Sequence, residues 1–271
     1  KRKPKVLNTH GSLLGYKKYL PSNQHTPYQL YDALTLKASA KSADAVVVSS
    51  KLEYEDAVEF GIQKTKLHVI PMGVDVDEYV DNPINPNGDA INILFVGRIA
   101  RVRRIEILLQ AVAKLSIPFH VTLVGGEEKT SSLSRSGYLD ELKKLCKDLN
   151  INDRVTFVGP VAQNELFNWY SKGDIFVYPS LYENFGQPIL EAAAAGLPIV
   201  SAAVGVAQEI ITDNETGFLF NGDDQELANR ITQLTDQNLR KKIGGAVRER
   251  VRSLYGWEGI IKQYLDLYRS L

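Results

Sequence analysis

Short apolar runs rich in Val and Ile alternate along the chain with longer stretches of helical period. Near-continuous apolar runs lie at 92–97, 120–125, 155–159, 175–180 and 198–203, and helical stretches lie between them at 105–115, 138–149, 165–172 and 188–195. Strands that are buried on both faces of a parallel sheet have this apolar character, and their alternation with helices is typical of βαβ units. The pattern predicts a doubly wound α/β domain over residues 91–254.

The first 80 residues repeat this alternation in a shorter form. Strands are predicted at 5–10, 45–50 and 66–71, with helices at 27–41 and 51–60. Three strands and two helices bury little surface for an independent α/β domain, so residues 1–78 are expected to form an incomplete one. Segment 79–90, rich in Pro, Asn, Asp and Gly, is expected to be a linker between domains.

Composition narrows the class of protein. Of the 271 residues 44% are hydrophobic, and 32 Lys and Arg balance 32 Asp and Glu, so the basic excess of a nucleic-acid-binding protein is absent. The single cysteine, Cys146, excludes an intramolecular disulfide and indicates a reducing compartment. No apolar run approaches the ~20 residues of a membrane span. A cytoplasmic protein is expected, and because the chain begins with Lys1, we expect it to be processed or truncated.

The strongest chemical pattern lies in residues 179–201, PSLYENFGQPILEAAAAGLPIVS. A strand is predicted to end at Ser180, and a helix to begin at Pro188 with Glu191 in its first turn. Ligands of doubly wound sheets bind at such strand ends, where a helix N-terminus favours phosphate. Glu183 and Glu191 can face one cleft and accept hydrogen bonds from sugar and ribose hydroxyls. Taken singly, each also fits an ordinary solvated or dipole-stabilised glutamate.

A second pattern, FVGRIARVRR at 95–104, gathers positive charge where a helix is predicted to begin. The four arginines are Arg98, Arg101, Arg103 and Arg104. Cations at a helix N-terminus oppose its dipole, so this cluster indicates a bound anion rather than only a solvated basic turn.

Together these patterns resemble the retaining nucleotide-sugar glycosyltransferases, particularly family 4, whose E-x7-E signature matches Glu183 and Glu191. Residues 95–104 are similar to the family's G-R-L-x-x-x-K-G element. The resemblance implies that Gly97, Arg98 and Arg103 bind the donor diphosphate, where fixed cations stabilise the leaving group. Arg103 replaces the usual Lys and Arg104 the usual Gly.

Other stretches resemble further parts of that family. VTFVGPV at 155–161 is similar to the segment that contacts the nucleotide base, which implies base contacts near Gly159 and Val161. NTHG at 8–11 is similar to the strand end whose histidine, here His10, faces the donor sugar. SAAVGVAQEIITDNETGFLF at 201–220 resembles the G-G-x-x-E stretch, with Val206 in place of the second Gly. That replacement is expected to restrict a close backbone approach.

The resemblance implies a GT-B fold of two Rossmann-like domains, with residues 255–271 forming a helix that crosses back to the N-terminal domain. It also implies transfer of a sugar from a nucleoside-diphosphate sugar to a sugar, glycan or lipid-linked acceptor, with retention of configuration by front-face displacement. The implied catalytic residues are Glu183 and His10. Asn184, Phe185 and Gly186 would hold the sugar and Glu191 the ribose.

The implied donor is a UDP-, GDP- or ADP-sugar, with neither cofactor nor metal required, and peripheral contact with the cytoplasmic face of a membrane is a further implied possibility. Roughly the first four βα elements of the family's N-terminal domain are missing from the sequence. The chain alone is therefore expected to bind a nucleotide without transferring sugar until a missing N-terminal segment or a partner chain is supplied.

Several alternatives stay open. The main one is a non-catalytic nucleotide-sugar-binding module or subunit that another chain completes. A Rossmann dehydrogenase ranks far lower, because no GxGxxG follows any predicted strand. A sugar-nucleotide epimerase or a phosphorylase would share the fold, but the cofactor-lysine motif of a phosphorylase is not seen.

Overall fold

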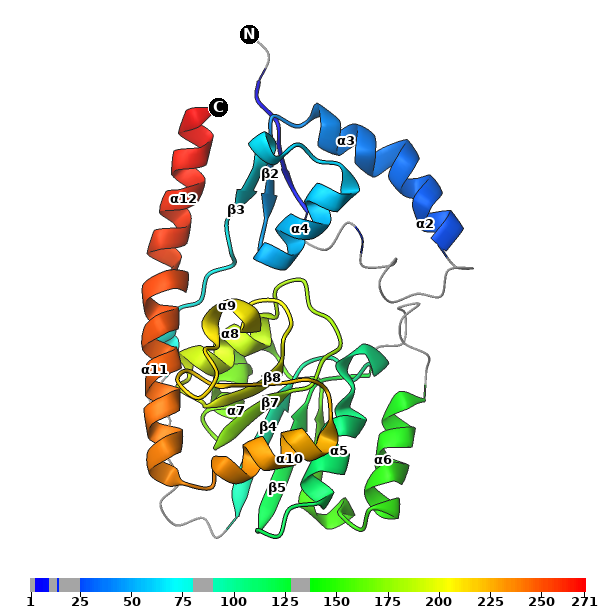
Figure 1. Ribbon diagram of the computed structural model, residues 1–271, viewed down its shortest axis with the longest axis vertical. Coiled ribbons are helices and arrows are strands. Elements are labelled where there is room, and N and C mark those ends of the chain that lie inside the picture. Colours follow the sequence, from blue (N-terminus) through cyan, green and yellow to red (C-terminus); the bar gives the residue numbers. More distant parts are fainter. Residues whose placement is uncertain (1–2, 10–13, 15–24, 80–89, 128–136) are drawn as a thin grey trace. The chain divides into compact units, whose positions relative to one another are not determined.

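The computed structural model of the protein describes residues 3–9, 14, 25–79, 90–127 and 137–271. The chain divides into two compact units. Unit 1 contains Lys1–Gly73 and Trp257–Leu271, and unit 2 contains Val74–Gly256. Each unit contains one parallel sheet with helices packed on it (Figure 1). The α/β class predicted from the apolar runs is confirmed.

Unit 2 is built on a six-stranded parallel sheet with the order β6-β5-β4-β7-β8-β9. Its strands are β4 (Ile91–Val96), β5 (Phe119–Val124), β6 (Val155–Gly159), β7 (Ile175–Tyr178), β8 (Ile199–Ala202) and β9 (Phe218–Phe220). The chain adds β5 and β6 on one side of β4, and then adds β7, β8 and β9 on the other. This reversal creates a topological switch point between β4 and β7.

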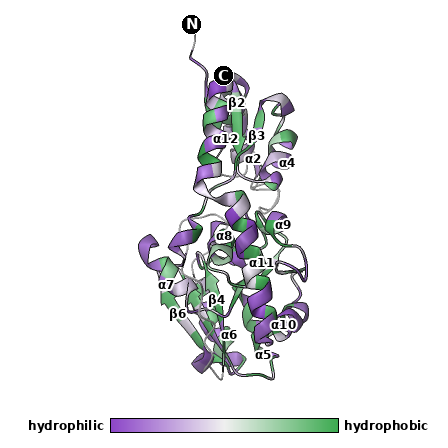
Figure 2. Ribbon diagram, turned by 90° about the vertical axis from the view of Figure 1, so that its left-hand side faces the viewer, coloured by the Kyte–Doolittle hydropathy of each residue, from purple (hydrophilic) through white to green (hydrophobic). Residues whose placement is uncertain are grey.

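Helices cover both faces of this sheet. They are α5 (Ile105–Ala113), α6 (Tyr138–Asp148), α7 (Leu166–Tyr170), α8 (Gln187–Ala194), α9 (Ala207–Ile210), α10 (Asp224–Gln233) and α11 (Gln237–Tyr255). Right-handed crossovers place α5 on one face and α7 and α8 on the other. Helix α5 packs beside α6 and α10, and α8 packs beside α11 (Figure 1). The strands between them are apolar throughout much of their length, and β7 and β8 are buried at every position (Figure 2).

Unit 1 has a three-stranded parallel sheet with the order β1-β2-β3. The strands are β1 (Val6–Asn8), β2 (Ala45–Val48) and β3 (Leu67–Val69), and the helices include α4 (Lys51–Phe60) and α12 (Trp257–Ser270). The helix predicted at 27–41 is α2 (His25–Tyr31), a π-helical turn (Asp32–Leu36) and α3 (Lys37–Ser42) in succession.

Strand β2 is covered on both faces. Val46 and Val48 pack in the cluster that contains Ala40 of α3 and Ala57 of α4. Ala45 and Val47 point the other way, into a cluster with Ile260 and Leu267 of α12. Because successive strand residues alternate between faces, the four-residue run AVVV supplies both clusters at once.

The boundary between the units lies a few residues before the expected position. Residues 74–79 pack with unit 2, because the Val74 amide donates to the Tyr255 carbonyl at 2.9 Å and Arg248 Nη2 donates to the Tyr79 carbonyl at 2.7 Å. Tyr255 ends α11, and Trp257 begins α12. Of the expected linker at 79–90, residues 80–89 lie outside the described residues.

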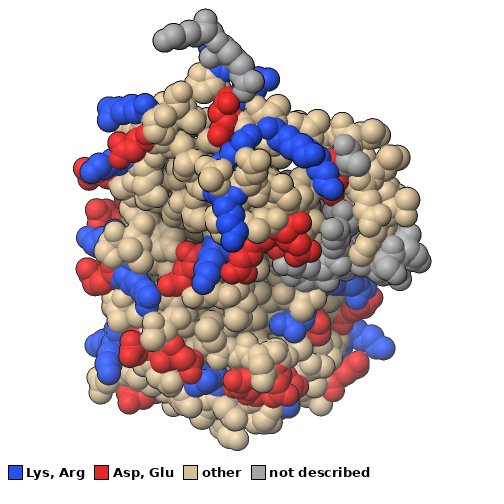
Figure 3. Space-filling view, turned by 45° about the horizontal axis from the view of Figure 1, so that its top comes forward, with Lys and Arg blue, Asp and Glu red and all other residues tan. Residues whose placement is uncertain are grey.

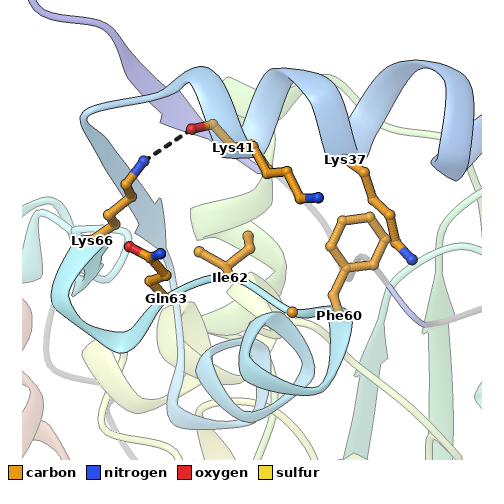
Figure 4. Close-up of a pocket in the computed structure, with 8 residues that line it drawn as sticks. Lys37, Lys41, Phe60, Ile62, Gln63 and Lys66 are labelled. Atoms are coloured by element: carbon orange, nitrogen blue, oxygen red, sulfur yellow. Dashed lines mark hydrogen bonds between the residues drawn. The ribbon is translucent and has the colours of Figure 1, made fainter.

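A cavity of about 500 Å³ lies in unit 1 between α3 and the loop that follows α4 (Figure 4). Lys37, Lys41 and Lys66 line it above Phe60 and Ile62. Lys66 Nζ donates to the carbonyls of Lys41 and Ala43 at 2.9 and 2.7 Å. This ammonium group satisfies carbonyls at the C-terminal end of α3, where positive charge is favoured. The site residues predicted above do not line this cavity.

Acidic and basic side chains are both spread over the face shown in Figure 3, and the sequence contains 32 of each. Within the described part of the chain, no helix has the length and apolar character that a membrane span requires.

Candidate functional site

The candidate site lies at the switch point of the unit 2 sheet. Strands β4 and β7 are direct neighbours, with Ile93 paired to Ile175 and Leu94 to Phe176. Because the strands are parallel, the segment 97–104 after β4 and the segment 179–186 after β7 leave the same edge of the sheet side by side. The two strongest sequence patterns are therefore brought together where doubly wound sheets bind ligands.

An ion pair joins the two segments. The Arg103 guanidinium pairs with the Glu183 carboxylate, and both side chains are nearly buried, at 10% and 12% exposure. Arg103 Nη1 also donates to Ser180 Oγ at 3.1 Å and to the Tyr182 carbonyl at 3.2 Å. Arg103 therefore holds the loop after β7 through its backbone as well as through Glu183.

Two guanidinium groups contribute positive charge to the site. Burial lowers the pKa of Arg103, and the nearby positive charge of Arg98 lowers it further. Arg98 itself is exposed. The two guanidinium groups are therefore close enough to influence each other, and positive charge gathered in this way favours a bound anion.

Tyr178, the last residue of β7, is a further part of this site. Its hydroxyl donates to Glu183 Oε1 at 2.5 Å, and the Arg103 guanidinium lies 5.7 Å from the centre of its ring. The ring is fully buried and stacks with Phe95 of β4 and Phe176 of β7.

Glu191 lies on α8 in a buried polar network. Tyr170 Oη donates to its Oε2 at 2.8 Å, and Gln163 Nε2 lies 3.4 Å from its Oε1. Burial raises the pKa of Glu191 above its ordinary value, although these hydrogen bonds oppose the shift. Helix α8 begins at Gln187, so Glu191 lies in the second helical turn rather than the first. Helix-dipole stabilisation therefore does not explain this buried carboxylate.

The loop between the two glutamates is held by the segment after β8. The Val206 amide donates to the Phe185 carbonyl at 2.6 Å. Gly205 has a φ of +46°, and a Cβ atom there would overlap that same carbonyl oxygen. The expectation that Val206 would restrict a close backbone approach is wrong, because Gly205 alone provides the space and the buried Val206 contributes its amide.

The amides of Phe185 and Gly186 donate no hydrogen bond within the described part of the chain. Gly186 caps α8 in a left-handed conformation, with a φ of +90°. The buried Phe185 ring lies against Tyr255, and Asn184 accepts a hydrogen bond from the Tyr182 hydroxyl. The loop thus presents two backbone donors beside the N-terminus of α8.

The four arginines of 95–104 separate into different surroundings. Arg101 forms a bidentate pair with Glu141, at 2.7 and 2.6 Å, so its charge is paired outside the contact between Arg103 and Glu183. Arg104 has a left-handed backbone, with a φ of +48°, and its Nε donates to the Pro179 carbonyl at 2.9 Å. Only Arg98 and Arg103 of the four were expected to bind the diphosphate, and Arg101 and Arg104 have partners elsewhere in the protein.

The remaining predicted residues are placed as follows. Gly97 follows β4, Gly159 ends β6, and the half-buried Val161 lies two residues further on, so all three lie at the carboxyl edge of the sheet. His10 lies outside the described residues. Among the residues that are described, no group of three or more His, Cys, Asp or Glu side chains is arranged to hold a metal ion.

Sequence reasoning missed three side chains that form hydrogen bonds with the glutamates, namely Tyr178 with Glu183, and Tyr170 and Gln163 with Glu191. The tyrosines lie in apolar runs and have the appearance of core residues. Tyr178 lies only five residues before Glu183, but Tyr170 and Gln163 lie 21 and 28 residues before Glu191, so only the fold shows that they meet this carboxylate.

Comparison with known families agrees with this geometry. The profile of the family "Glycosyl transferases group 1" matches residues 77–250, and that of "Glycosyltransferase Family 4" matches residues 1–78. The chain belongs to the group 1 glycosyltransferases. The family resemblance read from Glu183, Glu191 and Arg98 is therefore confirmed.

Two related glycosyltransferases illustrate the extent of the match. The D-inositol 3-phosphate glycosyltransferase of Xylanimonas cellulosilytica is 30% identical over 244 residues, which cover 84% of this chain and 57% of that protein. An uncharacterized glycosyltransferase of Methanocaldococcus jannaschii, MJ1607, is 29% identical over 99% of this chain and 70% of its own length. This glycosyltransferase chain thus spans a little over half of the first relative.

Solved structures give the same fold. Sucrose-phosphate synthase from Thermosynechococcus elongatus superimposes with a TM-score of 0.82 at 32% identity, over 98% of this chain and 67% of that one. Anabaena Alr3699/HepE, solved with UDP and glucose, has a TM-score of 0.86 at 22% identity, over 99% of this chain and 72% of its own. These likenesses confirm the GT-B class for this glycosyltransferase.

Proposed function

We propose that the protein to which this chain belongs transfers a sugar from a nucleoside-diphosphate sugar to an acceptor hydroxyl, with retention of configuration. The observation that carries the proposal is the meeting of Arg98, Arg103 and Glu183 at the switch point. There, positive charge suited to a diphosphate lies next to a carboxylate suited to a sugar hydroxyl, which supports the proposal.

Each part of the donor has a suitable group in unit 2. Arg98 and Arg103 would neutralise the diphosphate near the start of α8, and the amides of Phe185 and Gly186 would donate to the donor sugar. Glu191 would accept hydrogen bonds from the ribose hydroxyls, and Glu183 from a hydroxyl of the sugar.

Other proposed contacts complete the donor site. The base would lie near Gly159 and Val161, and Asn184 would contribute beside the sugar. Of the proposed catalytic pair, Glu183 lies in this site, while the proposed sugar contact of His10 rests on the family resemblance.

The proposed mechanism is front-face displacement assisted by the leaving phosphate, without a metal ion. Negative charge develops on the diphosphate as the glycosidic bond breaks, and cations already fixed by the protein stabilise it without reorganisation. Arg103 is preorganised in this sense, because Ser180 and Tyr182 accept hydrogen bonds from its guanidinium group. The acceptor would be a sugar, a glycan or a lipid-linked sugar.

Calorimetry with UDP, GDP and ADP, and with UDP-glucose, GDP-mannose and ADP-glucose, tests the proposal. Binding of one diphosphate and its sugar nucleotide in the micromolar range is expected. UDP is the first candidate, because the similar Anabaena structure contains it. No binding of any of the six compounds by a folded chain would contradict the proposal.

A matched pair of arginine variants tests the diphosphate assignment. Arg98→Ala should weaken diphosphate binding by about 2 kcal/mol, since hydrogen bonds to charged groups contribute roughly 1.5–3 kcal/mol. Arg101→Ala is the control, because Arg101 already pairs with Glu141 at an exposed position. Equal and small effects of the two substitutions would remove Arg98 from the site.

We further propose that this chain alone binds its donor but transfers little sugar, because it spans 57% of the first relative's length. Transfer needs both substrates held in line, and positioning can contribute about 7–11 kcal/mol to lowering the barrier. A transfer assay of this chain, alone and joined to the part of its first relative that it does not match, tests this. Robust transfer by the chain alone would support a complete enzyme, whereas binding without transfer in either form would favour a non-catalytic binding module.

A further inference from the structure

Tyr178 and Arg103 both bind the same oxygen of the Glu183 carboxylate. We propose that these two residues position Glu183, so that its second oxygen is presented to a hydroxyl of the donor sugar. This inference rests on the proposed function, in which Glu183 accepts a hydrogen bond from the donor sugar, and it adds how the Glu183 carboxylate is oriented. Tyr178 is a positioning residue in this proposal and does not itself touch the donor.

The geometry of the carboxylate is the first support. Oε1 of Glu183 accepts the Tyr178 hydroxyl at 2.5 Å and also receives the Arg103 guanidinium. Oε2 of Glu183 forms no hydrogen bond with any described residue. An ionised carboxylate accepts at both oxygens, so one oxygen is anchored and the other remains available for a hydroxyl donor.

The rigidity of Tyr178 is the second support. Its ring lies between Phe95, at a centroid distance of 5.5 Å, and Phe176, at 5.8 Å, and both pairs are nearly parallel. The residue is fully buried at the end of β7, so its hydroxyl has little freedom to move. Burial raises the pKa of Tyr178, and the hydroxyl therefore keeps its proton near neutral pH and donates it to the carboxylate.

The identity of residue 103 is the third support. The guanidinium contacts Ser180, the Tyr182 carbonyl and the Glu183 carboxylate at once, and so ties the loop backbone to the side chain that it carries. All three contacts are made by Nη1, so one nitrogen of Arg103 links the loop backbone to the Glu183 carboxylate. Arginine at this position can therefore orient Glu183 in addition to supplying positive charge.

Binding measurements on substituted chains separate positioning from a general structural role. The probes are the diphosphate and the sugar nucleotide that bind best to the unsubstituted chain, and the quantity compared is the ratio of their two dissociation constants. Tyr178→Phe should leave the diphosphate constant within about threefold and weaken the sugar nucleotide by about tenfold, the size of one charge-assisted hydrogen bond. Arg103→Lys and Glu183→Gln should change the ratio in the same direction.

A control and a double variant complete the test. Tyr138→Phe removes another buried tyrosine–glutamate hydrogen bond of unit 2, that to Glu106, and should leave the ratio unchanged. In the double variant Tyr178→Phe, Glu183→Gln, the ratio should be no worse than in Glu183→Gln alone, because Tyr178 acts through Glu183.

The possible failures are distinguishable. The positioning role would be overturned if Tyr178→Phe had the same ratio of dissociation constants as the unsubstituted chain. It would also be overturned if the double variant bound the sugar nucleotide more weakly than Glu183→Gln by the full effect of Tyr178→Phe. Either result would leave the proposed function standing. A folded unsubstituted chain that binds none of the nucleotides would overturn both. If Tyr178→Phe does not fold, the ratio of dissociation constants is measured in Arg103→Lys instead. An unchanged ratio in that variant would equally refute the proposal.

Discussion

Gly205 offers a sharp test of how the signature loop is held. A Cβ atom at this position would lie 2.7 Å from the carbonyl carbon of Phe185 and overlap its oxygen. That oxygen also accepts the Val206 amide, so the loop cannot move away without losing a hydrogen bond. Gly205→Ala should therefore displace the loop that contains Glu183, whose Cβ lies 3.2 Å from the new atom.

The expected loss of stability has two parts. An alanine with a φ of +46° is in the left-handed region, which costs about 1–2 kcal/mol for a residue with a Cβ atom. Overlap with packed neighbours adds about 1–3 kcal/mol. The free energy of unfolding should therefore fall by about 2–5 kcal/mol in total.

Gly137→Ala is the matched control. Gly137 has a φ of +95° in the same unit, but among the described atoms nothing lies within 4 Å of a Cβ placed there. This substitution should show only the conformational part, about 1–2 kcal/mol. Urea unfolding followed by tryptophan fluorescence measures both variants, and calorimetry with the sugar nucleotide measures the effect on the site. Equal destabilisation by the two substitutions, with unchanged binding in Gly205→Ala, would refute the close-approach argument.

Two further predictions concern buried positions of unit 2. Burial raises the pKa of Glu191 above the ordinary 4.5, so the folded protein retains this proton longer than the unfolded chain, and stability falls as pH rises through the raised pKa. Glu191→Gln removes that fall, so the unfolding free energy of the variant minus that of the unsubstituted chain should be larger at pH 8 than at pH 4. Nucleotide affinity should drop in the same variant. A difference in unfolding free energy that does not change with pH would contradict this. In α11, a Cβ on Gly244 would overlap the Gly196 carbonyl, whereas Gly245 has open space among the described atoms. Gly244→Ala should destabilise by about 1–3 kcal/mol and Gly245→Ala should stabilise by about 0.5–1 kcal/mol in thermal unfolding, and effects of the same sign would refute the packing.

Much of unit 2 could be predicted because its strands are buried on both faces. The runs at 92–97, 120–125 and 155–159 became β4, β5 and β6 within one residue of the expected bounds. Strand β9, Phe218–Phe220, has only three residues and lies inside a loop-like motif, so its apolar run was too short to stand out. Helix α8 began one residue early because Gly186, with its left-handed backbone, is its N-cap.

The site could be predicted only as far as local motifs reach. Loops with Glu183 and Arg103 were found because each lies in a recognisable segment. The two side chains pair because β4 and β7 are neighbours in the sheet, and neither segment alone predicts this strand order. Arg104 shows the same limit: its positive φ explains why a glycine is usual at this position, but the hydrogen bond to Pro179 that accompanies the arginine joins residues far apart in the chain.

The switch point also sets an order of events during biosynthesis. Strands β4 and β5 are joined by a short crossover, whereas the partner of β4 on its other side, β7, is synthesised about 80 residues later. Closing so long a loop is slow compared with forming a local βαβ unit. A chain leaving the ribosome therefore exposes the Arg103 guanidinium for several seconds before Glu183 is made, at ordinary elongation rates of about 5–20 residues per second. Until β7 emerges and docks beside β4, this cation has no carboxylate to meet, and the nucleotide site does not yet exist.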